Sequence, residues 1–539
     1  MSLFGSLYIG ASGLQTSQNA LNTTAHNMSN IDTVGYTRQQ VQLGTRTYKT
    51  ISKNASAISY QQTGLGVNYT QVKQVRDSFL DRSYRRESGR GAFYDTYTAA
   101  VEEVEDLFRE LHGEAFGESI DNLWTSVQEL AKDPGNPVNQ SVFVQRCSEF
   151  LTRASSVYSG LCAYQSNLNL KIGQQVDTMN AYAKRITELN QEIMKIEAGK
   201  VEHANDLRDE RNLLIDELSA MGNIECRTDA FGNILVRLEG KDFVNADTYN
   251  EIGLDVDMTT GFYTPYWKQL AKTTTEANGV TTVDITGAEL FNMTQTISTD
   301  TNTDIGSLKA LMFARGDRNA TYKDVQDEET YKREISQSIM MDVEAEFDQL
   351  IHEITLAINE VFKNAADKAT EANPNSTYMR DANGDPYTIF NTNTGDNLEA
   401  DFTIRKLLIN NEIKQAPTLL GFKREDEVID QELADALKAV FEEEKYTVNP
   451  NVKTPTNFIN YYNNMISLAG NRGNVFRGIS ENMEITVSNI SAAREQILGV
   501  SSDEELQNMI IYQNAYNASS RYINVISELL EHIINTLGS

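Results

Sequence analysis

Cysteine, proline and long apolar runs are scarce in this chain of 539 residues. Its three cysteines, Cys147, Cys162 and Cys226, are too sparse and too odd in number to form a disulfide framework. Eight prolines, together with long helical periodicities, favour a helix-rich protein. No run of about 18 apolar residues occurs, so the sequence predicts no membrane-spanning helix.

Basic residues are fewer than acidic ones, and the first thirty residues carry no charged side chain of Asp, Glu, Lys or Arg. The formal net charge is −29, and binding to nucleic acid or anionic lipid depends on Lys and Arg. We therefore expect no nucleic-acid partner and no membrane insertion. The basic start, apolar run and cleavage site of a signal peptide are missing from these thirty residues. We expect no cleaved signal peptide.

Patterns that carry catalysis or metal binding are missing too. No two of the five histidines lie within ten residues of each other, and the zinc-protease-like start at His352 has Leu at position 356. The stretch "DANGD" at residues 381–385 has its glycine at the fourth position, which favours a hairpin turn over a calcium loop. Because no nucleotide loop or nucleophile motif occurs either, we expect no enzyme, cofactor or metal.

The tripeptide Arg315-Gly316-Asp317 is a weak signal for adhesion. We interpret it as a charge pair in a loop, and we keep a secreted adhesin that acts through the middle of the chain as an alternative function.

Both ends of the chain carry a heptad pattern, which is typical of coiled coils. Near the N-terminus, large residues alternate with small ones such as Gly10, Ser17 and Thr24, while the C-terminal pattern is bulky almost throughout. A small seam and a bulky seam are complementary, so we infer that the two terminal helices pair; separate packing of each helix on the main body is the alternative. The predicted seam comprises Leu3, Leu7, Leu14, Leu21, Met28, Ile31, Met509, Tyr516, Ile523, Ile526, Leu530, Ile533 and Leu537.

The middle of the chain alternates between helical and β-rich patterns. Apolar stripes at helical spacing occupy residues 93–111, 172–196, 339–361 and 458–497. Residues 224–304 are rich in Thr, Val and Gly, with alternation at Ile234, Val236 and Leu238 and a hairpin signal at Asn278-Gly279. Residues 373–447 start with a turn-and-strand pattern and end in an acidic helix near residues 432–444.

These patterns predict a mainly α fold with β-rich inserts, an α+β protein. We expect four regions. Residues 1–50 with 503–539 form a terminal coiled coil; residues 51–223 with 320–372 and 448–502 form a helical domain. Residues 224–319 form a β-rich outer domain, and residues 373–447 form a small mixed α/β insert.

The stretch "ALNTTAHNMSNIDTVGYTRQ" at residues 20–39 resembles the N-terminal signature of bacterial flagellar rod, hook and hook-associated proteins. Its motif residues here are Asn30, Thr33, Gly35 and Tyr36. "GLGVNYTQVKQVRDSFLDRSYRRE" at residues 64–87 and "EELQNMIIYQNAYNASSRYINVISELL" near the C-terminus continue the resemblance.

Three further stretches are similar to the hook-associated branch of that family. They are "SIDNLWTSVQELAKDPGNP" at residues 119–137, "ANDLRDERNLLIDELS" at residues 204–219 and "REQILGVSSDEEL" at residues 494–506. Two positions depart from the family pattern: Val34 stands where many relatives have Pro, and Val127 where a second Trp is common. The resemblance covers residues 1–240, 305–365 and 455–539 and leaves both inserts without a family role.

The resemblance implies a structural subunit of the flagellum at the junction of hook and filament. It implies a ring of about eleven subunits, with the hook protein and hook-associated protein 3 as neighbours. It also implies export without a cleaved signal to an extracellular position, and a cytoplasmic export chaperone bound at the C-terminal helix. A hook or rod component is the alternative within the same class.

Overall fold

The chain divides into two units, each built from separate stretches of sequence. The computed structural model describes residues 3–47, 49–53, 60–109, 116–199, 202–275, 281–374, 376–381, 383–394, 398–424 and 428–537. Unit 1 comprises residues 1–89, 178–251 and 483–539, and unit 2 comprises residues 90–177 and 252–482. Helices dominate and the sheets are small and antiparallel, so the mainly α prediction with β-rich inserts is confirmed. The expected four-part division stays a prediction.

Three long helices contribute residues to both units. They are α2 (Ser78–Arg109), α4 (Pro137–Glu197) and α12 (Phe458–Leu498). The elements that lie within unit 1 are α1 (Leu3–Ser29), β1 (Gln39–Thr45), β2 (Lys49–Lys53), β3 (Tyr60–Thr63), β4 (Val67–Gln74), α5 (Asn205–Met221), β5 (Ile224–Thr228), β6 (Ile234–Leu238), β7 (Lys241–Val244) and α13 (Ser502–Leu537).

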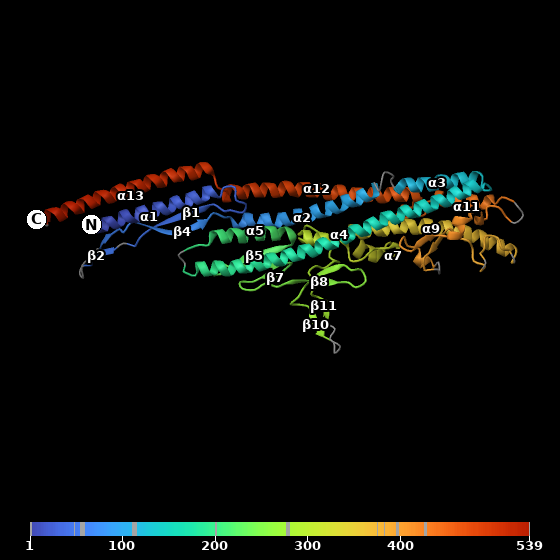
Figure 1. Cartoon of the computed structure of the whole chain (residues 1–539), viewed down its shortest axis with the longest axis horizontal. Coiled ribbons are helices and arrows are strands. Elements are labelled where there is room, and N and C mark those ends of the chain that lie inside the picture. Colours follow the sequence, from blue (N-terminus) through green and yellow to red (C-terminus); the bar gives the residue numbers. More distant parts are fainter. Residues whose placement is uncertain are drawn as a thin grey trace. The chain divides into compact units, whose positions relative to one another are not determined.

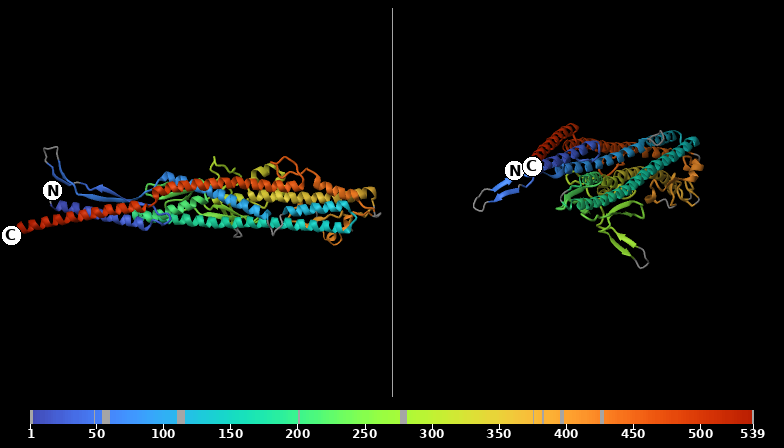
Figure 2. Two further views of the ribbon diagram at one scale, coloured as in Figure 1. Left: turned by 90° about the horizontal axis from the view of Figure 1, so that it is seen from above. Right: turned by 60° about the vertical axis from the view of Figure 1, so that its left-hand side comes forward.

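The two terminal helices pair in unit 1, as the complementary seams predict. Figures 1 and 2 show α1 and α13 side by side, with both chain termini at the same end of the pair. The pairing is antiparallel, because Gly10 lies against Ile523 while Gly13 lies against Ser519. Separate packing of the two helices, the alternative raised above, is therefore wrong.

A β-ribbon follows α1 and was not expected from the sequence patterns. β1 pairs with β4 in antiparallel register, with a bulge at Gln42/Leu43, and β2 pairs with β3. The side chains of β1 and β4 are mostly half-buried or exposed. No clean apolar alternation therefore marks these strands, and the ribbon packs on α1 instead of on a second sheet.

The predicted β-rich stretch contributes strands to both units. In unit 1, β5, β6 and β7 form a three-stranded sheet, and Ile234, Val236 and Leu238 of β6 point to its buried face as the alternation predicted. In unit 2, β8 (Ile252–Val256) pairs with β9 (Tyr263–Trp267), and β10 (Lys272–Thr275) pairs with β11 (Thr281–Asp284). The predicted hairpin turn at Asn278-Gly279 lies outside the described residues.

Among the described residues, unit 2 contains the remaining helices and helical turns. They are α3 (Phe116–Lys132), α6 (Ser307–Arg315), α7 (Tyr322–Gln326), α8 (Glu328–Thr330), a π-helical turn η1 (Tyr331–Ile335), α9 (Ile339–Ala372), 3₁₀ turns η2 (Glu399–Asp401) and η3 (Pro417–Leu420), α10 (Asn411–Gln415) and α11 (Gln431–Glu442). β12 (Phe390–Thr392) pairs with β13 (Leu407–Ile409).

An aromatic cluster joins five helices in the core of unit 2. The Phe116 ring of α3 lies 4.9 Å from Phe347 of α9, 5.7 Å from Phe150 of α4 and 5.4 Å from Tyr462 of α12. Phe108 of α2 lies 5.4 Å from Phe347. All of these contacts except the tilted Phe116–Phe150 pair are edge-to-face, and such pairs contribute roughly 0.5–1.5 kcal/mol each beyond the burial of apolar area.

The apolar stripes predicted for the long helices are largely buried. Phe93, Tyr97 and Val101 of α2 are buried, and so are the predicted stripe residues of α9, namely Ile339, Val343, Phe347, Leu350, Ile354 and Ile358. Ile196 is an exception: it lies in the last turn of α4 and is exposed. Leu111 lies outside the described residues.

The second insert contains the helix expected near its end, while its standing as a separate part stays a prediction. The acidic helix expected near residues 432–444 forms as α11. Asp430 caps its N-terminus, because the Asp430 carboxylate accepts a hydrogen bond from the Leu433 amide. The "DANGD" stretch is the turn of a hairpin. Arg380 and Pro386, on either side of it, form an antiparallel β-bridge, and Gly384 has a positive φ. Ala382 of that turn lies outside the described residues.

The interpretation of Arg315-Gly316-Asp317 as a charge pair in a loop is wrong. Arg315 ends α6 and is only 2% exposed, and its guanidinium donates hydrogen bonds to the Asn169 side chain and the Tyr263 carbonyl. Asp317 pairs with Arg318 instead. Burial of Arg315 leaves only Asp317 of the tripeptide exposed, whereas an adhesive role requires the arginine at the surface as well.

Four carboxylates are buried in the first turns of α9. Asp342, Glu344, Glu346 and Asp348 are all at most 3% exposed, and they form two pairs of like charge four residues apart. Arg472 pairs with Asp342, whereas Glu344 accepts the Ala320 amide with Oε2, and its Oε1 has no hydrogen-bond partner at normal distance among the described residues. Burial raises the pKa of Glu344 to about 8 and that of Asp348 to about 6.

We expect unit 2 to lose stability as the pH rises, and Glu344→Gln to remove part of that loss. Since the pKa of Glu344 is higher in the folded chain than in the unfolded one, the folded state binds more protons between pH ~4.3 and pH 8. Ionised Glu344 therefore opposes folding above pH 8, and we expect the variant to be more stable there by about 2 kcal/mol. Urea unfolding of both proteins at pH 5 and pH 8.5 measures the difference.

Glu360→Gln is the matched control, because Glu360 is exposed on the same helix. It should shift stability by less than about 0.5 kcal/mol at either pH. An identical pH dependence in the Glu344→Gln protein and the wild type would contradict this account of Glu344.

Candidate assembly site at the terminal helices

The face of α1 that packs against its neighbours is made of small side chains. A Cβ added at Gly10 would lie 2.7 Å from Cγ1 of Ile523, and one at Gly13 would lie 2.8 Å from Oγ of Ser519. Contacts this short leave no room for a larger residue. The fully buried positions of α1 are Gly10, Ser12, Thr16, Ser17, Ala20, Thr24 and Asn27.

The large residues of the predicted seam flank this buried face. Ile526 is buried, and the half-buried members are Leu7, Leu14, Leu21, Met28, Met509, Tyr516, Ile523 and Leu530. Ile31 differs from the expectation, because α1 ends at Ser29 and leaves Ile31 in the following turn, 42% exposed. Ile533 is exposed in the chain alone. The side chains of Leu3 and Leu537 lie outside the described part.

Two tight turns carry the motif residues away from α1. The Thr33 amide donates to the Asn30 carbonyl, and the Tyr36 amide donates to the Thr33 carbonyl. Gly35 occupies the third position of the second turn with a φ of 80°, which a residue with a Cβ rarely adopts. The side chains add to this geometry, since the Thr33 hydroxyl donates to Oδ1 of Asn30. The structure thus brings the four predicted motif residues into one continuous turn structure.

Asn27 connects these turns to the β-ribbon, and it was not singled out by the sequence analysis. Its side chain donates to the Gln39 carbonyl and accepts from the Gln39 amide at 2.9 and 3.0 Å. Its Oδ1 also accepts the Tyr36 hydroxyl at 2.8 Å. Burial, followed by the charges of Asp209 and Asp206, raises the pKa of Tyr36, so the phenol stays protonated and donates this bond.

The start of α5 fixes the same turns from a distant part of the sequence. The Thr37 amide donates to Asp209, which also accepts the Gln74 side chain. Burial raises the pKa of Asp209 to about 6, although the hydrogen bonds from Thr37 oppose the shift. Any Cβ at Gly35 would touch the Leu213 side chain at 3.3 Å. The motif of residues 30–36 and the internal stretch of residues 204–219 therefore form one site.

The segment between α12 and α13 reaches the site as well. Arg38 forms ion pairs with Glu504 at 2.8 Å and Glu505 at 3.0 Å, and its amide donates to the Leu498 carbonyl. Glu505 is buried. The start of α13 is thereby tied to the residue that follows the motif turns.

A buried ion cluster completes the arrangement. Arg494 pairs with Asp81 at 2.8 Å and with Asp216, and its guanidinium lies 4.7 Å over the Tyr84 ring. Arg76 pairs with Asp81 at 3.0 Å, and Arg85 pairs with Asp216 at 2.7 Å. Burial alone would raise the pKa of Asp81, but the hydrogen bond and charge of Arg76, with Arg494 and Arg85, hold it below its usual value.

The cluster joins stretches that lie far apart in the sequence. Asp81 belongs to residues 64–87, Asp216 to residues 204–219 and Arg494 to residues 494–506. Each of these three stretches separately resembles the flagellar family, and the ion pairs bring all three to one place in unit 1. Removing Asp81 takes an ion-pair partner from both Arg76 and Arg494, and the loss of a partner from a buried ion pair costs about 3–5 kcal/mol.

A cavity of about 550 Å³ lies beside the cluster. Its lining comprises residues 31–37, one face of α5 between residues 212 and 220, and the end of α12 with residues 498–500. Arg76, Tyr84 and Arg494 line it as well. Among the residues described, no group of three or more His, Cys, Asp or Glu side chains is placed to hold a metal ion.

His352, which carried the weak zinc signal, lies in unit 2 with its ring buried. Its Nδ1 lies 2.8 Å from the Phe402 carbonyl, and the ring stacks on Tyr322 at 3.6 Å. Within the described ranges, no helix is long and apolar enough to cross a membrane.

Comparison with protein families finds three matching regions. Residues 101–375 match the family described as "Flagellar hook-associated protein FlgK helical domain". Residues 7–37 match "Flagella basal body rod protein", and residues 496–536 match "Flagellar basal body rod FlgEFG protein C-terminal". The second and third matches coincide with α1 plus the motif turns and with α13.

Individual relatives agree with these matches. The chain is 27% identical to "Flagellar hook-associated protein 1" of Bacillus subtilis over 542 residues, which cover 100% of this chain and 99% of the relative. It is 25% identical to the protein of the same name from Salmonella typhimurium over 243 residues, which are 45% of this chain and 42% of the relative.

A solved structure is also similar. "The structure of the flagellar hook junction protein FlgK from Burkholderia pseudomallei" aligns with a TM-score of 0.39 at 15% identity, over 57% of this chain and 46% of that one.

We expect Asn27→Ala to loosen the turn structure after α1. The substitution leaves the amide and carbonyl of Gln39 and the hydroxyl of Tyr36 without their partner, which costs about 3 kcal/mol in total. Hydrogen–deuterium exchange should become faster in peptides that cover residues 30–45. Asn22→Ala, at an exposed position of the same helix, is the control and should leave exchange unchanged.

We expect Val34→Pro to stabilise unit 1 by about 0.4–1 kcal/mol. Val34 is 80% exposed and occupies the second position of the turn closed by Thr33 and Tyr36, where proline presets the required φ. Thermal unfolding measures the gain. Thr33→Pro is the matched control and should destabilise, because the Thr33 amide donates to Asn30. A loss of stability in Val34→Pro would contradict the assignment of the turn.

Proposed function

The chain belongs to the flagellar hook-associated protein family whose FlgK helical domain its residues 101–375 match, and from this premise we propose that it forms the junction between the flagellar hook and filament. It is a structural subunit of the bacterial flagellum, and filament assembly depends on it. The observation that carries this function is the convergence of α1, the motif turns, α5 and α13 on one site, because both rod-family matches fall on those elements.

The surfaces of the paired helices support assembly with further copies. The exposed stripe of α1 from Ala11 to Ser29 carries only small or amide side chains. α13 exposes several large apolar residues, among them Ile511, Tyr522, Val525 and Leu529, which share one face of the helix at helical spacing. Large apolar residues gathered on an exposed face are typical of an interaction surface. Uncharged faces also avoid repulsion between identical neighbours in a wall that excludes water.

The finer assignments are part of the same proposal. The subunits form a ring of about eleven copies, with the hook protein on one side and hook-associated protein 3 on the other. A cytoplasmic export chaperone binds the C-terminal helix before export without a cleaved signal, and the assembled ring is extracellular. The protein acts by contact and not by catalysis.

Two other functions fit less well. A hook or rod component shares the terminal helices, but the match to the helical domain of a hook-associated protein spans residues 101–375. A secreted adhesin that uses the Arg315 tripeptide requires an arginine that projects from the surface toward a protein receptor, and Arg315 is only 2% exposed.

We expect a strain without this protein to carry hooks without filaments and to release flagellin monomers into the medium. Electron microscopy and a blot of the medium measure both results. The wild-type gene should restore filaments. Gly10→Leu should not, because its side chain has no space between α1 and α13.

Gly199→Leu is the matched control, since nothing lies within 4 Å of a Cβ at Gly199. It should restore filaments as the wild type does. Normal filaments in the deletion strain would rule out the junction role. Full rescue by Gly10→Leu would leave that role intact and refute the close packing of the terminal helices.

A further inference from the structure

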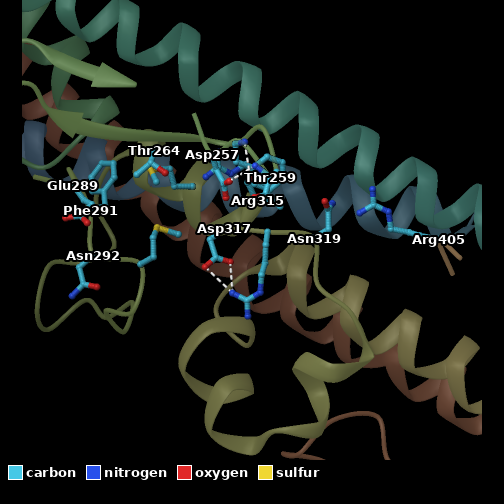
Figure 3. A pocket seen from close by; sticks show the side chains of 15 residues that line it. Asp257, Thr259, Thr264, Glu289, Phe291, Asn292, Arg315, Asp317, Asn319 and Arg405 are labelled. Carbon is cyan, nitrogen blue, oxygen red and sulfur yellow. Dashed lines mark hydrogen bonds and ion pairs between the residues drawn. The ribbon is translucent and has the colours of Figure 1, made fainter. Parts of the chain in front are cut away.

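A cavity of about 950 Å³ opens in unit 2, far in sequence from the terminal helices. Figure 3 shows its lining residues, which come from the β8–β9 hairpin, from residues 289–293, from α6, from residues 317–319 and from Arg405. Sites for small ligands have volumes of about 300–1,000 Å³. The cavity is therefore large enough to enclose a small organic molecule.

Arg315 lies in this cavity in a fixed orientation. Its Nε donates to the Gly316 carbonyl at 2.9 Å, and its Nη1 donates to Asn169 at 2.6 Å and to the Tyr263 carbonyl at 2.9 Å. The guanidinium also lies 4.7 Å over the Phe262 ring. In the part of the chain that the structure describes, nothing accepts a hydrogen bond from Nη2. Two N–H groups of a rigid, buried arginine are thus left for a ligand.

The charge of Arg315 is also uncompensated among the described residues, where it has no ion pair. Burial lowers the pKa of Arg315 to about 10, and Asp317 opposes that shift only from a distance. The carboxylates that line the cavity are exposed and already engaged: Asp257 accepts the Thr259 amide, Glu289 accepts the Gly287 amide, and Asp317 pairs with Arg318.

Exposure decides which of these charges dominates inside the cavity. Solvent and salt screen the exposed carboxylates, whereas Arg315 is 2% exposed and its field is screened much less. A buried cation without a partner is costly, so an anion that reaches Nη2 recovers part of that cost. The cavity accordingly favours a carboxylate over a neutral or cationic group at Arg315.

The rest of the lining is rich in hydroxyl and amide groups. Thr264 of β9 has a hydroxyl that makes no hydrogen bond within the described ranges, and Asn292 lines the cavity with an exposed side chain whose NH₂ group is available as a donor. Such groups exchange hydrogen bonds with ligand hydroxyls, and the Phe262 face supplies apolar contact. We propose that this cavity binds a small acidic sugar, with the sugar carboxylate on Nη2 of Arg315 and its hydroxyls against Thr264 and Asn292.

Titration calorimetry on the full chain tests the proposal with D-glucuronate as the probe. D-glucose lacks the carboxylate and acetate lacks the hydroxyls, so both should bind at least about tenfold more weakly than glucuronate. Glucose binding as tightly as glucuronate would show that Arg315 does not bind the carboxylate. Acetate binding as tightly would reduce the cavity to a simple anion site. Either result, or no binding of glucuronate, overturns the proposal.

A substitution at Arg315 tests its contact with the carboxylate of the ligand. Arg315→Gln should weaken glucuronate binding by at least about tenfold, because a charge-assisted hydrogen bond is lost. Arg477→Gln is the control, since it removes an arginine of unit 2 that pairs with Glu102 away from the cavity. It should leave binding unchanged. Unchanged binding in a folded Arg315→Gln protein would overturn the proposal.

Thr264→Val keeps the test decisive if Arg315→Gln does not fold. Valine has the shape of threonine and lacks only the hydroxyl. We expect glucuronate binding to weaken by roughly fivefold while acetate binding stays the same. Identical glucuronate affinity in this variant and the wild type would contradict the placement of the sugar hydroxyls.

Discussion

The close approach of α13 to the small face of α1 is the contact on which the rest of unit 1 depends. Gly10 and Gly13 leave just enough room for Ile523 and Ser519. The polar side chains of that face satisfy their own hydrogen bonds, as when the Thr16 hydroxyl donates to the Ser12 carbonyl. A helix can therefore bury hydroxyl groups on two sides without the cost of unpaired polar atoms. α13 packs on one side of α1, and the β-ribbon packs on another, where the Val67 amide donates to Ser12.

The position of α1 in turn sets the geometry of everything attached to its end. Asn27 ties the last turn of the helix to Gln39, and Arg38 ties the following strand to the start of α13. The ion cluster of Arg494, Asp81 and Asp216 then holds α2, α5 and α12 to the same place. Residues separated by more than 400 positions in sequence become one structural element, as a junction subunit with both termini in its assembling part requires.

Local periodicity predicted a large part of this architecture. The small and bulky seams predicted the helix pair, the alternation at Ile234 and Val236 predicted β6, and the glycine of the motif predicted a turn. Each of these features is encoded by residues close together in sequence. Their side chains face a single surface, so a repeat of seven, two or four residues is enough to reveal them.

Features that depend on distant partners could not be predicted in this way. Nothing around Asn27 indicates that its partner is a backbone group twelve residues away, and Arg494 meets Asp81 across 413 residues. The β-ribbon lacks an apolar face of its own, because α1 supplies its packing surface. Arg315 was assigned to a loop for the same reason: its partners Asn169 and Tyr263 belong to other elements.

The most direct test of the central claim is a disulfide between Gly13→Cys and Ser519→Cys in assembled flagella. A Cβ at Gly13 would lie 3.6 Å from Cβ of Ser519, which suits a disulfide. With Cys147, Cys162 and Cys226 replaced by Ser, mild oxidation of flagella from swimming cells should give a cross-link within one chain. Cross-links only between chains, or none, would contradict the antiparallel pair as the unit of assembly.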